Sequence, residues 1–171
     1  MMIMKEDITM KKQEHLPVYG VGPFCVYTMV LILIIAITLD HFNYLDQGKV
    51  ASLKIPMFIG GCILILIGIC IWIKAVLIDK IGDNILKNHL LTSGIYAYVR
   101  NPIYSAALIA LSGIALLFNN LYFLILPFIF WAFISVLMKH SEEKWLLKQY
   151  GQEYRDYCAK VNRCIPWFPK K

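Results

Sequence analysis

The sequence predicts an all-α integral membrane protein with four transmembrane helices and a C-terminal amphipathic helix at the membrane interface. Of the 171 residues, 59% are hydrophobic and 16% are charged. A soluble domain of this length would carry roughly a quarter charged residues. Four apolar runs, at residues 21–39, 55–78, 103–118 and 121–138, each approach the ~20 residues that a helix needs to cross a bilayer.

The basic residues predict which ends of these helices face the cytoplasm. Lysine and arginine are concentrated in the N-terminal tail, between the second and third runs, and after the fourth run. The other two loops contain only Lys49 and Lys54. Because cytoplasmic loops carry the excess of basic residues, we expect both termini to be cytoplasmic. The net charge of +6 then reflects topology and does not indicate nucleic-acid binding.

The chain divides by composition into a cytoplasmic tail at residues 1–20, two N-terminal transmembrane helices at 21–80, and a final region at 81–171. Cysteine and histidine do not cluster, so no metal site is expected. Ala106, Ala110 and Gly113 lie on one side of the third helix, which predicts close helix packing. Pro127 is expected to bend the fourth helix.

A two-residue link at positions 119–120 separates the third and fourth runs and predicts an antiparallel hairpin. Positions equidistant from this link then lie side by side. Glu142 and Glu143 are therefore expected at the level of Ala97 and Tyr96, at the cytoplasmic surface.

The dipeptide Asn101-Pro102 predicts the start of the third helix. Asn is a good N-cap residue, and Pro at the first helical position loses only a donor that would be unpaired. The first turn then offers free N–H groups at the membrane surface, which suit an anionic group.

After the membrane, the fourth helix is expected to continue to about Gln149 and to stop at Tyr150-Gly151. Residues 152–160 predict a short helix with an aromatic face and a charged face, which would lie on the bilayer or cover the mouth of the hairpin. Together these features describe a cavity where a soluble polar cofactor meets a lipid-borne substrate.

Two groups of motifs stand on either side of the predicted hairpin. The first is Thr92-Ser93-Gly94-x-Tyr96-x-x-x-Arg100-Asn101-Pro102-x-Tyr104. The second comprises Glu142-Glu143-x-x-Leu146, Tyr150-Gly151-x-x-Tyr154-x-x-Tyr157 and Val161-x-Arg163-x-Ile165-Pro166. Over residues 85–168 the chain resembles the isoprenylcysteine carboxyl methyltransferase family and its bacterial relatives, whose general plan phospholipid methyltransferases share.

The resemblance implies a membrane methyltransferase that uses S-adenosylmethionine, with its signature in residues 81–171. Carried over by motif, the implied cofactor-binding residues are Asn88, His89, Leu90, Leu91, Tyr96, Asn101, Pro102, Ile103, Tyr104 and Glu142. The candidate catalytic residues are Arg100, Lys139 and Glu143.

Two positions depart from the family pattern. Asn101 stands where the family usually has histidine. Met138 stands where eukaryotic members have an arginine that handles the substrate carboxylate, and Lys139 beside it would substitute only as a point charge.

The leading hypothesis is methyl transfer to a lipophilic acceptor at the cytoplasmic membrane surface. The acceptor is a small molecule, a lipid or a lipidated peptide, and the sequence leaves open whether oxygen, nitrogen or sulfur is methylated. The expected partners are this substrate and the bilayer, and nucleic acid is not expected. Two alternatives remain: an NADPH-dependent membrane reductase of the sterol-reductase type, and a non-catalytic membrane protein that retains the fold.

Overall fold

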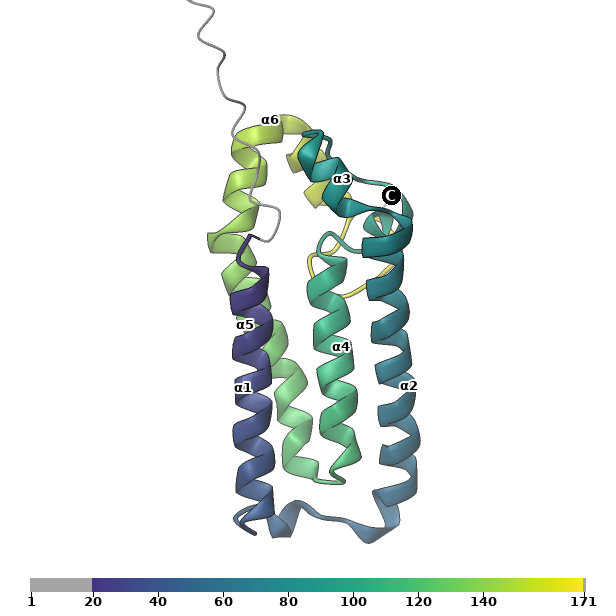
Figure 1. Ribbon diagram of the computed structural model, residues 1–171, viewed down its shortest axis with the longest axis vertical. Coiled ribbons are helices and arrows are strands. Elements are labelled where there is room, and N and C mark those ends of the chain that lie inside the picture. The colour runs from purple at the N-terminus through teal and green to yellow at the C-terminus, as the bar shows by residue number, and fades with distance from the viewer. Residues whose placement is uncertain (1–19, 171) are drawn as a thin grey trace, which may run out of the picture.

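Four helices run along the long axis of the molecule, and α4 lies at their centre in contact with the other three (Figure 1). The computed structural model describes residues 20–170, so the tail predicted for residues 1–20 lies outside the described residues except for Gly20. The four helices are α1 (Gly22–His41), α2 (Lys54–Ile73), α4 (Pro102–Leu117) and α5 (Leu126–His140).

Two further helices, α3 (Ile81–Leu86) and α6 (Glu142–Lys160), lie together at one end of the molecule, which we call the site end (Figure 1). A π-helical turn at Lys74–Ile78 extends α2 toward this end. Short 3₁₀ turns occupy Asp46–Gly48, Ala51–Leu53, Gly94–Ala97 and Leu121–Ile125.

The regular elements of the described chain are all helices, as the sequence predicts, and three of its helical stretches are long and apolar enough to cross a membrane. These are Gly22–His41, Ala51–Ile78 and Leu121–His140. The stretch Pro102–Leu117 is also apolar but shorter, with 16 residues. Outward residues such as Leu31, Leu66 and Phe128 are more than half exposed. Such extensive apolar exposure suits contact with lipid tails. That four helices span the bilayer stays a prediction.

The backbones of α2 and α4 approach closely at glycine positions. A Cβ atom added to Gly61 would lie 2.7 Å from the carbonyl oxygen of Gly113, and one added to Gly68 would lie 2.8 Å from that of Ala106. This contact confirms the close packing predicted from the small residues of the third helix. This close packing places the C-terminal end of α2 beside the start of α4.

At the opposite end, a buried polar cluster joins the loop after α1 to the turn before α5. The amide nitrogen of Asn120 donates to Asp40 Oδ1 at 2.7 Å and to the Leu45 carbonyl at 3.0 Å. Lys49 lies 3.3 Å from the same carboxylate of Asp40. Because Asp40 and Asn120 are both buried, these contacts satisfy groups that would otherwise be costly to desolvate.

Two expectations for the last helices are corrected. The helix of the fourth run does not continue to Gln149, because Ser141 has non-helical angles (φ −122°, ψ −91°) and separates α5 from α6. Pro127 does not bend a helix interior. It lies in the first turn of α5, after a 3₁₀ turn, where a missing N–H is tolerated.

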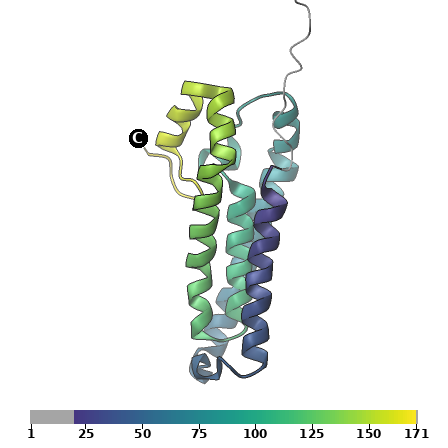
Figure 2. The ribbon, with the colours of Figure 1, turned by 90° about the vertical axis from the view of Figure 1, so that its left-hand side faces the viewer.

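The predicted stop at Gly151 is present as a kink. Gly151 has φ +55°, and the second half of α6 folds back at the site end (Figure 2). The aromatic face of this half, with Tyr154 and Tyr157, is buried against Leu90 and Val161. Whether this helix lies on the bilayer or covers the mouth of the hairpin, the two placements that the sequence left open, stays a prediction.

The glycine contact predicts an asymmetry between two neighbouring substitutions in α2. In Gly61→Ala the added methyl group collides with the backbone of α4, which should cost roughly 1–3 kcal/mol of stability. Gly60→Ala is the matched control, because its Cβ would lie 3.9 Å from the nearest atom, in Leu116. Thermal unfolding in detergent measures the difference. Equal midpoints for the two variants would contradict the packing described here.

Candidate functional site

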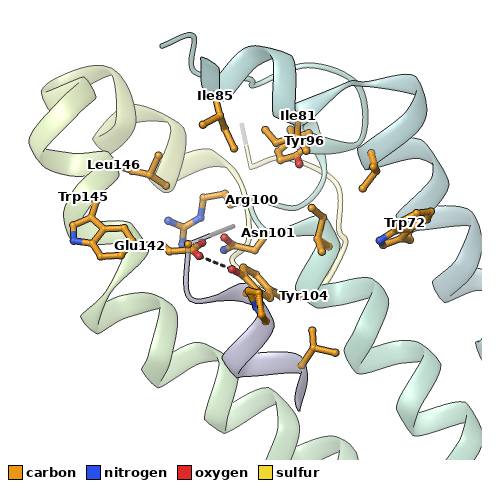
Figure 3. A pocket seen from close by; sticks show the side chains of 17 residues that line it. Trp72, Ile81, Ile85, Tyr96, Arg100, Asn101, Tyr104, Glu142, Trp145 and Leu146 are labelled. Atoms are coloured by element: carbon orange, nitrogen blue, oxygen red, sulfur yellow. Dashed lines mark hydrogen bonds between the residues drawn. The ribbon is translucent and has the colours of Figure 1, made fainter. Parts of the chain in front are cut away.

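A cavity of about 480 Å³ opens at the site end, between the starts of α1 and α4, the end of α2, and α3 and α6 (Figure 3). This volume is in the range of about 300–1,000 Å³ that is typical of small-molecule sites. Most of its wall is apolar, with contributions from Trp72, Ile81, Ile85 and Trp145. The polar groups are few and lie near the centre of the view in Figure 3.

The carboxylate of Glu142, the first residue of α6, is the acidic group in this wall. Glu142 Oε1 accepts hydrogen bonds from the hydroxyl of Tyr104 and, at 3.1 Å, from the backbone N–H of Val21. Burial raises the pKa of Glu142, and the two hydrogen bonds oppose this shift. An ionised carboxylate in an apolar cavity favours a cationic ligand group.

The neighbouring Glu143 turns away from the cavity and binds two arginines. Arg163 donates to it through two nitrogens, at 2.6 and 2.9 Å, and Arg100 Nη1 lies 3.1 Å from Glu143 Oε1. The bidentate contact raises the pKa of Arg163. Arg100 also lines the cavity, and its side chain is 8% exposed. Its Nε is buried without a partner among the described residues.

The chain after α6 pairs with the start of α4. The backbone N–H of Arg100 donates to the carbonyl of Asn162 at 2.9 Å, and that of Asn101 donates to the carbonyl of Arg163 at 3.2 Å. The side chain of Asn101 does not cap α4, contrary to the prediction. Its amide nitrogen instead donates to the Arg163 carbonyl at 3.1 Å, because the returning chain supplies this acceptor.

The turn that carries Tyr96 is held by Asp79, just after α2. Asp79 Oδ2 accepts a hydrogen bond from the N–H of Ile95 at 2.7 Å. Gly94 has φ +63°, and a Cβ there would lie 2.3 Å from the same carboxylate, so no side chain fits. On its other side, the Tyr96 carbonyl accepts from the hydroxyl of Tyr157 at 2.6 Å. The Tyr96 side chain is thereby placed in the cavity wall.

Of the residues named from the sequence, about half line the cavity: Tyr96, Arg100, Asn101, Ile103, Tyr104 and Glu142. The proximity of the acidic pair to the Arg-Asn-Pro segment follows the hairpin prediction. The contacts are displaced by one to two turns, from Tyr96 and Ala97 to Arg100 and Tyr104. The 3₁₀ turn before α5 and the break at Ser141 alter the register.

The other named residues lie outside the cavity wall. Leu90 packs on the tyrosines of α6, and Pro102 is buried. Asn88 Oδ1 accepts from Gln149 at 2.6 Å, and His89 Nδ1 is 3.1 Å from Asn84 Oδ1. The remaining three are Leu91, which is half-buried, Lys139, which is exposed, and Glu143, which is held by the arginines. The roles proposed for these residues stay predictions.

Several residues that line the cavity were not predicted from the sequence. Trp145 and Leu146 follow Glu142 by three and four residues, the spacing that places helical side chains on one face. This spacing could have identified them. No comparable signal marks Gly20, Gly22 or Trp72, because their places in the wall depend on how α1 and α2 pack around α4.

Comparison with known proteins agrees with the motifs. The chain is 39% identical over 85 residues to a protein-S-isoprenylcysteine O-methyltransferase of Schizosaccharomyces pombe. The aligned region covers 48% of this chain and 36% of that protein. It is 33% identical over 82 residues to a probable protein-S-isoprenylcysteine O-methyltransferase of Oryza sativa subsp. indica, covering 47% of this chain and 42% of the relative. The matches thus span well under two thirds of these relatives.

A family model described as phospholipid methyltransferase matches residues 56–153, more than half of the chain. These residues include most of α2, all of α4 and α5, and the first part of α6. Trp72, Arg100, Tyr104 and Glu142 of the cavity wall lie within the matched range. The chain therefore belongs to the phospholipid methyltransferase family, within which it resembles the isoprenylcysteine-directed enzymes.

Proposed function

We propose that the cavity binds S-adenosylmethionine and that the protein methylates a lipophilic acceptor at the membrane surface. The observation that carries this proposal is the half-buried carboxylate of Glu142 in an otherwise mostly apolar cavity of small-molecule size. S-adenosylmethionine supplies an electrophilic methyl group on a cationic sulfonium, next to an ammonium and a carboxylate. Family membership and the names of the relatives support methyl transfer.

The residues of the wall fit the two ends of such a cofactor. Glu142 is placed to bind a cationic group, and the aromatic faces of Trp145 and Tyr104 add favourable surroundings for positive charge. Arg100 is the single basic residue among the described lining residues, and its positive charge suits an anionic group. The phosphates of NADPH, the cofactor of the alternative reductase function, would need more basic residues than this wall contains.

We further propose a carboxylate as the methyl acceptor, as in the prenylated cysteine for which the relatives are named. A carboxylate is already ionised at neutral pH and needs no general base. The described wall contains no histidine, and its titratable side chains are Tyr96, Arg100, Tyr104 and Glu142. An amine acceptor would require one of these groups to remove a proton.

The arrangement relative to the membrane is part of the proposal. The connection after α2 and the chain after α5 contain most of the basic residues, and both lie at the site end. The positive-inside rule then places the cavity at the cytoplasmic surface. Residues 81–171 supply the methyltransferase signature, and the two N-terminal helices complete the wall around it.

Purified protein should bind S-adenosylmethionine and methylate a lipophilic carboxylate. Calorimetry in detergent measures binding, with NADPH as the comparison ligand. Incubation of methyl-labelled cofactor with a prenylated cysteine peptide, followed by alkaline hydrolysis, measures ester formation. Labelled product that resists alkali would indicate an amine or thiol acceptor. Binding of NADPH without S-adenosylmethionine would contradict the proposal.

Glu142→Gln should weaken cofactor binding by about 1–3 kcal/mol, because a charge-assisted contact becomes a neutral one. Burial raises the pKa of Glu142, so its ionised form is gained only as the pH rises through this raised value. Affinity in the unsubstituted protein should therefore fall on acidification, and the fall should begin at a higher pH than an ordinary glutamate would give. Glu142→Gln should lose this pH dependence, whereas Glu153→Gln, on an exposed position of α6, should keep it. Calorimetric titrations at several pH values test this.

Glu143→Gln is expected to act mainly on stability. The change leaves the buried guanidinium of Arg100 without its counter-charge, and breaking a buried ion pair costs roughly 3–5 kcal/mol. The thermal midpoint should fall clearly below that of Glu153→Gln. If the two variants have the same thermal midpoint and Glu143→Gln alone loses turnover, the result would instead support a direct catalytic role for Glu143.

A further inference from the structure

The start of α1 contributes to the cavity although it lies outside the residues that the family model matches. Gly20, Val21 and Gly22, which we call the glycine clasp, pass directly beside Glu142 and Tyr104. A Cβ atom on Gly20 would lie 2.3 Å from Glu142 Oε1, and one on Gly22 would lie 3.2 Å from the Tyr104 hydroxyl. Gly20 also has φ +47°, a conformation that favours glycine.

The clasp makes one specific polar contact with Glu142. The backbone N–H of Val21 donates to Oε1 at 3.1 Å, and the hydroxyl of Tyr104 donates to the same oxygen. Among the described residues, no hydrogen bond reaches Oε2. Both protein donors thus act on one carboxylate oxygen of a residue that lines the cavity.

The position of Glu142 in the chain makes this external support important. Glu142 is the first residue of α6 and follows Ser141, whose non-helical angles interrupt the run from α5. Its side chain therefore depends on contacts from α1 and α4 to fix its direction. Those contacts come from segments that are distant in sequence, by 121 and 38 residues.

We propose that the glycine clasp is a positioning element that orients the Glu142 carboxylate toward the cationic group of the bound cofactor. This inference rests on the proposed function. The two glycines bring the α1 backbone close enough for the Val21 N–H to reach the carboxylate. The N–H also favours the ionised form of Glu142, the form that binds a cation. The other titratable groups around this carboxylate are Tyr104, Tyr96 and Cys25, and the charged side chain of Arg100 lines the same cavity wall.

Two substitutions at Val21 separate the backbone donor from the side chain. Val21→Pro removes the N–H, whereas Val21→Ala keeps it and shortens only the side chain. Val21 lies at the N-cap of α1 with φ −90°, where proline is compatible with the start of a helix. Gly20→Ala is a third variant, which leaves the Val21 N–H but places a methyl group against Oε1.

S-adenosylmethionine affinity is measured by calorimetry for the full chain in detergent, from pH 5 to pH 8. Val21→Pro should bind about tenfold more weakly than the unsubstituted protein at neutral pH, as expected for one lost charge-assisted hydrogen bond. Gly20→Ala should weaken binding to a similar degree, because its methyl group pushes the Glu142 carboxylate away from the Val21 N–H. Val21→Ala should bind as the unsubstituted protein does. In Val21→Pro the pH midpoint of binding should also move to higher pH, a change that loss of packing would not produce.

The outcomes distinguish the two proposals. If the unsubstituted protein does not bind S-adenosylmethionine, the proposed function itself fails. If it binds, and Val21→Pro and Gly20→Ala match Val21→Ala in affinity and in pH midpoint, the clasp is overturned while the function stands. Thermal midpoints are recorded for every variant. If Val21→Pro does not fold, the affinity of Gly20→Ala compared with that of Val21→Ala tests the clasp.

Discussion

The ion cluster around Glu143 holds together the three chain segments on which the site depends. Arg100 precedes α4, Glu143 lies in the first turn of α6, and Arg163 follows α6. These segments are separated in sequence by the whole α4–α5 hairpin and by the kinked helix. The charges are mostly shielded from water, so their contact is weakly screened and has a narrow set of favourable geometries. The backbone hydrogen bonds between residues 100–101 and 162–163 then form alongside it.

Consecutive glutamates have different environments because of this cluster. Glu143 is neutralised by two guanidinium groups, whereas Glu142, one residue earlier, faces the cavity with a hydroxyl and one backbone N–H as its donors. One of the pair therefore contributes to the framework and the other remains available for binding. Neighbouring residues on a helix point in directions about 100° apart, so an acidic pair at a helix start naturally separates these two tasks.

The parts of the molecule that could be predicted from the sequence are those governed by local patterns. The apolar runs gave the helices to within a few residues, and the short link at 119–120 gave the hairpin that brings Glu142 near Tyr104. The kink at Gly151 followed from its turn chemistry. The side chain of Asn101 could not be placed, because its partner is a carbonyl 62 residues away. The wall formed by Gly20 and Trp72 likewise depends on packing between distant helices.

The unequal lengths of α2 and α4 set the depth of the cavity. The stretch Pro102–Leu117 has 16 residues. At 1.5 Å per residue it is about 24 Å long, less than the ~30 Å hydrocarbon layer of a typical bilayer. The neighbouring stretch Ala51–Ile78 has 28 residues and continues past the start of α4 (Figure 1). The cavity lies above the start of α4, beside the part of this longer stretch that continues past it. In the proposed reaction, an acceptor would then reach the methyl donor while its hydrocarbon chain stays anchored in the adjoining leaflet.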